Sequence, residues 1–239
     1  MLRRLRSSRP KRNRSALRTD PPRDCTLCPR LRATIRRSRK DNPDWFNAPV
    51  PTWFPPEGPD SVRLLILGLA PGLKGANRTG RAFTGDASGD LLYPTLIRTG
   101  FARGRFENRA DDGLDLVDTA ISNAVRCVPP ANHPTGAEIA TCRKFLESTL
   151  KSLPNLEAAV TLGKIAHDSL VRTMGARLSR HPFGHGATSQ IDGIRIFSSY
   201  HCSRYNVNTG RLTPEMFEAV FSEVSGFLAA ADRPIRARG

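Results

Sequence analysis

The chain has 239 residues, which is enough for one α/β domain with a complete hydrophobic core. Its formal net charge of +15 indicates an anionic partner. No run of about 18 apolar residues is present, which argues against a membrane span, and no apolar stretch follows the first basic residues, which argues against a secretory signal peptide.

The positive charge is concentrated at the start of the chain. Residues 1–40 hold 15 of the 37 Lys and Arg residues and only two acidic residues, Asp20 and Asp24. Residues 1–20 contain few apolar side chains, so we expect a disordered basic arm there. Such an arm is either a solvated tail or a non-specific tether to phosphates. We expect residues 21–239 to form a single domain.

Apolar runs and helical patterns alternate along this domain. In chain order we predict a strand at 63–69, a helix at 88–99, a strand at 119–125, a helix at 135–150, a strand at 158–162, a helix at 164–174, a strand at 194–200 and a helix at 213–230. Thr135 and Glu138 have the spacing of a capping box, and Pro214 suits a first helical position. The alternation predicts the α/β class, as a three-layer α/β/α sandwich around a central four-stranded parallel sheet.

Four of the five cysteines form a pattern typical of a metal site. Cys25 and Cys28 form a C-x-x-C pair, and Cys127 and Cys142 lie fifteen residues apart. Four thiolates bind either a [4Fe–4S] cluster or a tetrahedral zinc ion. The wide spacing of the second pair does not fit an ordinary zinc ribbon, whose two pairs are both closely spaced. Cys202 has no cysteine near it in the sequence, so we expect it to be an isolated buried residue. The pattern predicts a metal site and leaves the metal open.

In an open parallel sheet, ligands bind beyond the carboxyl ends of the strands. The segments that leave the predicted strands are GLAPG (68–72), NAVRCVPP (123–130), TLGKIAH (161–167) and SYHCSRYN (199–206). We therefore expect the functional site to be built from these loops.

Several longer segments together carry a resemblance to a known family. They are GLAPGLKGANRTGRAFTGDASGD (68–90), AVRCVPP (124–130), HPFGHGA (181–187) and SYHCSRYNVNTGRLT (199–213). In sequence and order they closely resemble family 5, or type-B, uracil-DNA glycosylases. The resemblance implies a monofunctional DNA glycosylase that hydrolyses the N-glycosidic bond of uracil and of other deaminated or damaged bases, which initiates base excision repair. It also implies a structural [4Fe–4S] cluster bound by Cys25, Cys28, Cys127 and Cys142.

Breaking the C1′–N bond requires a positioned water, stabilisation of the departing base anion and a pocket for the everted base. Leu69 and Ala70 are apolar where related families supply a polar residue for the water. We therefore expect Asp86 to orient or activate the water, although an Asp at this position could also only cap the following helix. His201 resembles the histidine that donates a hydrogen bond to the base carbonyl.

The resemblance also implies base and DNA contacts. We expect Phe83 to stack on the everted base and Asn123 to read its edge. The remaining expected contacts are Gly68 and Ala70 to the base, and Asn77, Arg78, Ser203, Arg204 and Asn206 to DNA. The loop 203–208 should fill the vacated stack, with Arg204, Tyr205 and Asn206 as candidates for the wedge.

These expectations describe a monomer that acts on DNA, most simply duplex, in the prokaryotic cytoplasm near the nucleoid, with no membrane partner. The main alternative is a non-catalytic nucleic-acid-binding module with a cysteine-bound metal, which charge and cysteines alone would suit. The placement of Asp86, His201, Phe83 and Asn123 near strand ends favours the enzyme. A small-molecule hydrolase is disfavoured because no G-x-S-x-G motif is present, and the basic loop of a glycosylase that attaches covalently to its product is not seen.

Overall fold

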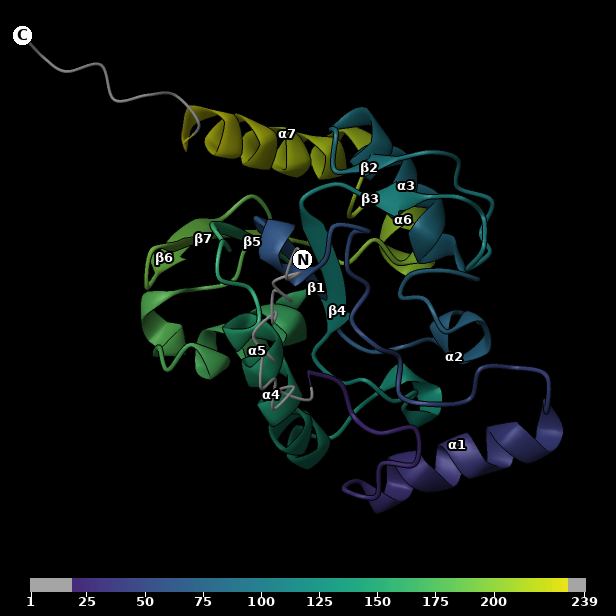
Figure 1. Cartoon of the computed structure of the whole chain (residues 1–239). Helices are drawn as coiled ribbons and strands as arrows, with labels where there is room; N and C mark the ends of the chain where they lie inside the picture. The colour runs from purple at the N-terminus through teal and green to yellow at the C-terminus, as the bar shows by residue number, and fades with distance from the viewer. Residues whose placement is uncertain (1–18, 232–239) are drawn as a thin grey trace, which may run out of the picture.

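A computed structural model describes residues 19–231 of the chain. At its centre is a five-stranded sheet with the strand order β4-β1-β5-β7-β6 (Figure 1). The strands β1 (Leu64–Gly68), β4 (Thr119–Asn123), β5 (Ala158–Leu162) and β7 (Ile194–Ser199) are parallel. These are the four predicted strands, so the parallel part of the sheet is confirmed.

The fifth strand, β6 (Thr188–Ile191), corrects the predicted strand count. It pairs antiparallel with β7 at the edge of the sheet. The two strands are joined through Asp192 and Gly193, which both have positive φ angles, of 48° and 84°, as a two-residue hairpin turn requires. The strand is short and mostly polar, so apolar runs did not predict it, but the Asp-Gly pair is a hairpin signal.

Helices cover both faces of the sheet, as the predicted sandwich requires. α3 (Ala87–Arg98) and α7 (Pro214–Ala231) pack on the face that carries Leu64 and Ile66 of β1. α4 (Gly136–Lys151) and α5 (Lys164–Thr173) pack on the opposite face, which carries Leu65 and Leu67. In Figure 1, α7 runs above the strands and α4 and α5 lie below them. Strands β1, β4 and β5 are buried along their whole length because helices cover both of their faces.

The ends of these helices follow the sequence signals. Thr135 and Glu138 form the predicted capping box at the start of α4, with the Glu138 amide 3.2 Å from the Thr135 hydroxyl and the Thr135 amide 2.8 Å from the Glu138 carboxylate. Pro214 is the first residue of α7. The remaining elements are short: η1 (Pro59–Ser61), α2 (Ala76–Thr79), β2 (Ala102–Arg103), β3 (Asp115–Leu116), η2 (Pro130–Asn132), η3 (Leu178–Arg180) and α6 (Arg204–Asn208).

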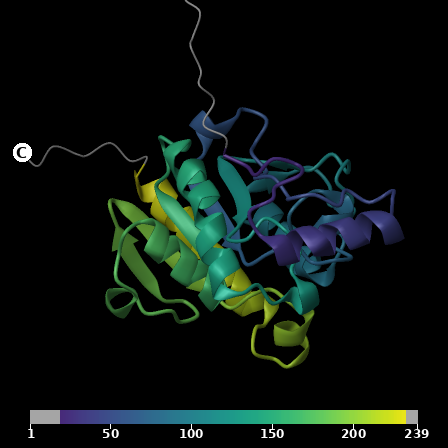
Figure 2. The same ribbon diagram turned by 90° about the horizontal axis from the view of Figure 1, so that it is seen from below.

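The sequence did not predict the short helices α2 and α6, nor the longer α1 (Pro29–Asp41), which directly follows the C-x-x-C pair. Leu31 and Ile35 of this helix are buried against Val125, Val128 and Phe145, in a small core separate from the two faces of the sheet. Figure 2 shows α1, in purple, at the side of the molecule. The signal for it was Pro29, which suits a first helical position. The helix anchors the N-terminal segment beside the loop that follows β4.

The basic arm predicted for residues 1–20 lies outside the described residues except for its last two. Asp20 is part of the fold, which corrects the predicted boundary. Its carboxylate accepts hydrogen bonds from the Thr52 amide at 2.9 Å and from Arg126 Nη1 at 2.8 Å. Arg126 is fully buried and also donates to the hydroxyls of Thr52 and Thr149. Within residues 19–231, no helix is long and apolar enough to cross a membrane.

Candidate active site

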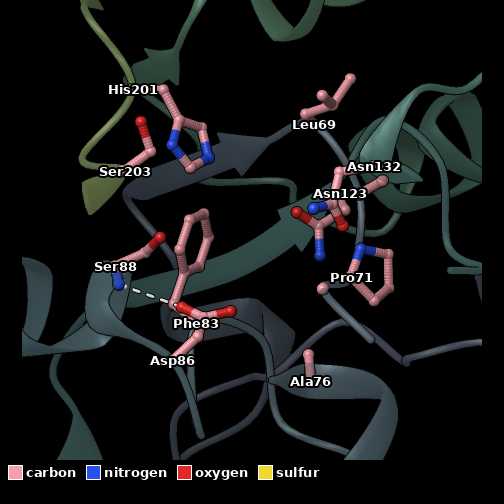
Figure 3. Close-up of a pocket in the computed structure, with 12 residues that line it drawn as sticks. Leu69, Pro71, Ala76, Phe83, Asp86, Ser88, Asn123, Asn132, His201 and Ser203 are labelled. Atoms are coloured by element: carbon pink, nitrogen blue, oxygen red, sulfur yellow. Dashed lines mark hydrogen bonds between the residues drawn. The ribbon is translucent and has the colours of Figure 1, made fainter. Parts of the chain in front are cut away.

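A cavity of about 290 Å³ lies at the carboxyl ends of β1, β4 and β7. Figure 3 shows His201 and Ser203 on one side of it, Asn123, Asn132 and Pro71 on the other, and the Phe83 ring between them. The lining residues are Leu69, Ala70, Pro71, Gly72, Ala76, Phe83, Asp86, Ser88, Asn123, Asn132, His201 and Ser203. The structure therefore gathers the expected water-directing, base-stacking and base-reading side chains around one cavity.

Phe83 reaches this cavity because its backbone adopts an unusual conformation. Its φ angle is 53°, in the left-handed region that bulky residues rarely enter. The neighbouring residues hold it there. Arg81 is buried and donates to both Asp112 oxygens, at 2.8 and 2.7 Å, and to the Thr84 hydroxyl at 2.9 Å. The Tyr93 hydroxyl donates to the Ala82 carbonyl. A rigid turn thus supports the aromatic floor of the cavity.

Asp86 caps α3 and also lines the cavity, so the observed cap does not exclude the predicted role toward water, which stays a prediction. Its Oδ1 accepts a hydrogen bond from the Ser88 amide at 3.0 Å, drawn as a dashed line in Figure 3. Its Oδ2 lies against the backbone of Gly72 and Gly75, where a Cβ atom at Gly72 would be only 2.9 Å from that oxygen. The two glycines therefore make room for the carboxylate.

Gly68 has a comparable supporting role and does not line the cavity. A Cβ atom there would lie 2.5 Å from both Asn123 Oδ1 and Phe83 Cζ. Gly68 therefore lies beside two side chains that face the cavity, and its expected contact with the base stays a prediction. Ala70, the other small residue expected at the base, does line it.

His201 follows β7 and faces Phe83, with ring centroids 5.9 Å apart and planes inclined by 34°. Burial lowers the pKa of the His201 imidazole below its ordinary value, and the Asp86 carboxylate opposes this shift only in part. The backbone around it is fixed: Asn206 Nδ2 donates to the His201 carbonyl at 2.8 Å, and the Tyr200 amide donates to His185 Nδ1 at 3.2 Å. The His201 ring is therefore held at the cavity wall.

The residues expected at the DNA backbone divide into three groups. Asn77 is fully buried, where its amide donates to Ser38 and Asn47, so the expected DNA contact is corrected to a structural role. Arg78 is exposed and uses part of its guanidinium to brace the carbonyls of Lys74 and Gly85.

The last group surrounds α6. Ser203 lines the cavity and caps α6, while Asn206 holds the His201 backbone. Arg204 and Tyr205 are exposed, and Tyr205 has 71% of its surface accessible. The exposed side chains of this loop are those of Arg204, Tyr205 and Asn208, so Arg204 and Tyr205 are the wedge candidates that remain exposed.

Asn132 is a lining residue that the sequence interpretation missed. It lies in η2, within the segment PPANHP, between β4 and α4. Its φ angle of 58° is one that Asn tolerates better than most residues. An Asn after two prolines and before a helix cap was the available signal.

The four cysteines of the predicted metal site line one small cavity between α1, the loop after β4 and α4. Burial and then the neighbouring thiols of Cys142, Cys25 and Cys28 raise the pKa of Cys127. Among residues 19–231, no three His, Cys, Asp or Glu side chains are close enough to hold one metal ion. Cys202 is instead buried in the main core.

Comparison with known proteins agrees with this arrangement. Residues 55–225 match the family model of the uracil DNA glycosylase superfamily. The chain is 45% identical to a type-5 uracil-DNA glycosylase of Thermus thermophilus over 206 residues, which cover 83% of this chain and 91% of that protein. It is 42% identical to the Mycobacterium leprae type-5 enzyme (83% and 89% covered) and 37% identical to that of Pyrobaculum aerophilum (87% and 89%).

Proposed function

The chain belongs to the type-5 uracil-DNA glycosylases of the uracil-DNA glycosylase superfamily, and we propose which residues carry out its reaction and which bases it removes. It is a DNA glycosylase, which hydrolyses N-glycosyl bonds and excises uracil from DNA. We propose that it is monofunctional, that it also excises other deaminated or damaged bases, and that it initiates base excision repair on chromosomal DNA, most simply as a monomer acting on duplex. Family membership favours this enzyme over the non-catalytic metal-binding module.

One observation carries the proposed site: Asp86, His201, Phe83 and Asn123 line a single cavity at the carboxyl edge of the sheet. The everted uracil would stack on Phe83. Asn123 suits the uracil edge because its amide can both donate and accept hydrogen bonds. His201 would donate a hydrogen bond to a base carbonyl and stabilise the negative charge that develops there on cleavage.

Asp86 would direct the attacking water. One carboxylate oxygen is held by the cap of α3, and the other is packed against Gly72 and Gly75. The hydrogen bond and the packing together fix the orientation of the carboxylate, so its negative charge has a defined position at the cavity. A fixed anion there would orient the water and stabilise the oxocarbenium-like sugar. The apolar Leu69 and Ala70 also line the cavity and offer no alternative base.

We also propose that Cys25, Cys28, Cys127 and Cys142 hold a [4Fe–4S] cluster. A zinc ion requires all its sulfur ligands at about 2.3 Å from one point, whereas a cluster distributes its four thiolates over several iron atoms. The four thiols line one cavity, and the wide sequence spacing of Cys127 and Cys142 does not fit an ordinary zinc ribbon, which supports the cluster. The Arg126 amide donates to Cys142 Sγ at 3.4 Å, and the buried Arg126 guanidinium lies near enough to Cys142 and Cys127 to interact with their charges. When bound, the cluster would cross-link α1 to the loop after β4.

Asp86→Asn tests the site, because Asn caps helices as well as Asp does and only the charge is removed. In single-turnover assays with an oligonucleotide that contains one uracil, we expect excision to slow by at least about 100-fold with duplex binding retained. Asp90→Asn is the matched control, since Asp90 is exposed in the first turn of the same helix. Excision by Asp86→Asn at the rate of Asp90→Asn would remove Asp86 from the mechanism.

The same assay tests the reaction class. A monofunctional enzyme leaves an intact strand that breaks only after alkali treatment, and hypoxanthine or xanthine in place of uracil tests the base range. Strand cleavage without alkali, or release of uracil alone from the panel, would contradict that part of the proposal.

A further inference from the structure

Asn132 has no assigned role, yet its side chain lines the mouth of the cavity (Figure 3). It is exposed, whereas Asn123 and Phe83 farther inside are buried. Within the described part of the chain its side-chain amide has no hydrogen-bond partner; the one bond of this residue joins its backbone amide to the Pro129 carbonyl at 3.2 Å. Two N–H donors are therefore presented at the entrance.

The loop that carries Asn132 is held in a costly backbone conformation. Ala131 and Asn132 have φ angles of 50° and 58°, and the left-handed region is unfavourable for alanine. Pro129 and Pro130 precede them and restrict the backbone further. Consecutive left-handed residues persist only where the surrounding structure enforces them, and here they aim the Asn132 side chain at the cavity.

Helix α1 supplies that enforcement. Arg30 Nη2 donates to the His133 carbonyl at 2.9 Å, and the same guanidinium pairs with Glu138 at 2.7 Å. Glu138 in turn accepts from the Thr135 amide. Arg30 is two residues beyond Cys28, so the segment proposed to hold the cluster also fixes the mouth of the cavity. The Asn132 donors are thus positioned before any ligand binds, which lowers the entropic cost of using them.

The chemistry at the mouth suits an anion. Segment 129–137 contains no acidic residue, and the first carboxylate after it, Glu138, is engaged by Arg30. When a nucleotide is rotated into a pocket, its base goes inside and its phosphates remain at the rim. Asn side chains are common donors to DNA phosphates, and the inner position at the base edge belongs to Asn123.

We propose that Asn132 donates a hydrogen bond to a phosphate that flanks the everted nucleotide and so strengthens the binding of DNA at the mouth of the cavity. This inference rests on the proposed function, because it takes the cavity to be the site of the everted nucleotide. It adds a substrate contact outside the base pocket.

The variants Asn132→Ala and Asn132→Asp test the contact, because a phosphate contact should change the half-saturating enzyme concentration and leave the excision rate at saturation nearly unchanged. Hydrogen bonds to charged groups correspond to roughly ten- to hundredfold in affinity, so we expect Asn132→Ala to raise the half-saturating enzyme concentration about tenfold. Asn132→Asp should raise it further, because a carboxylate repels the phosphate. The excision rate at saturation should stay within about threefold, and inhibition by free uracil, which has no phosphate, should not change. Asn155→Asp, before the amino end of β5 and far from the cavity, controls for the charge change.

Three results would overturn the proposal. Wild-type half-saturation in both variants would show that no contact exists, and binding by Asn132→Asp as tight as by Asn132→Ala would show that no phosphate is near. Weaker inhibition by free uracil in Asn132→Ala would place the residue on the base instead. Binding to duplex with a stable abasic analogue measures the phosphate contact without catalysis. If wild-type protein excises no uracil, the proposed function fails while this binding difference remains measurable.

Discussion

Gly75→Ala should inactivate the enzyme by displacing one carboxylate. Gly75 lies before α2, and a Cβ atom there would be 2.9 Å from Asp86 Cγ and closer still to Oδ2. Ordinary van der Waals contact is at about 3.5 Å, so the Asp86 carboxylate must retreat by roughly 1 Å. Displacements of this size from a productive geometry cost about 100-fold in rate. We expect uracil excision to fall by about that factor.

The substitution should also lower stability. The backbone angles of Gly75, φ −92° and ψ −118°, lie outside the regions that L-residues favour, so Ala adds backbone strain of about 1–3 kcal/mol. The cap that Asp86 provides to α3 is worth about 1 kcal/mol more. Single-turnover excision and urea unfolding, measured on the same preparation, separate the two effects.

Gly226→Ala is the matched control for this substitution. Gly226 lies within α7, where a Cβ atom would meet nothing within 4 Å. Ala is favoured over Gly in a helix by about 0.8–1.0 kcal/mol, so this variant should be slightly more stable and fully active. Wild-type excision by Gly75→Ala would refute the reasoning, because it would mean that the exact position of Asp86 is unimportant.

Three further predictions follow from buried groups. Burial alone would raise the pKa of Asp112, but hydrogen bonds from Arg81 and from two backbone amides lower it to about 2; Asp112→Asn leaves the Arg81 charge unpaired and should cost about 3–5 kcal/mol in urea unfolding at pH 7. Because the native pKa is depressed, this difference should persist at pH 5 and shrink as the pH falls from about 4 toward 2; a constant gap would contradict the pairing. Burial lowers the pKa of His201, so below about pH 6.5 the unfolded chain binds a proton that the native chain does not. Wild-type protein should therefore lose more stability than His201→Gln between pH 7 and pH 5, and parallel losses would show that His201 is not shielded. Cys142→Ser should lose bound iron and its visible absorbance and expose α1 to proteolysis, whereas a colourless, zinc-loaded wild-type protein prepared without oxygen would rule out the cluster.

The sheet and its helices could be predicted from the sequence because their signals are local. The apolar strands are buried on both faces, and the capping box at Thr135 and Glu138 marks the start of α4. Helix α1 gave a weaker pattern: its sequence PRLRATIRRSRKD buries only Leu31, Ile35 and Ser38, so its many arginines suggested a solvated surface. Strand β6 was missed because it is polar and held mainly by pairing with β7.

The sequence predicted the site residues that belong to a recognisable motif. It did not predict the roles of residues that depend on tertiary packing. Asp86, His201, Phe83 and Asn123 stand in recognisable segments. The roles of the glycines depend on which side chain fills the space beside each one, and that is a property of tertiary structure: Gly75 accommodates Asp86, and Gly68 accommodates Asn123 and Phe83. Asn77 is polar and stands in a motif, yet it is buried against the end of α1. Nothing local in the sequence indicates that contact.

The central claim is that uracil is cleaved while it is held in the cavity between Phe83, Asn123, His201 and Asp86. The most direct test is a crystal structure of the protein with a duplex that contains a non-hydrolysable 2′-fluoro-deoxyuridine. We expect the uracil ring stacked on Phe83, its edge within hydrogen-bond distance of Asn123 and His201, and a water between Asp86 and C1′. A uracil bound elsewhere on the protein, or a bound uracil with Asp86 turned away from the sugar, would contradict the claim.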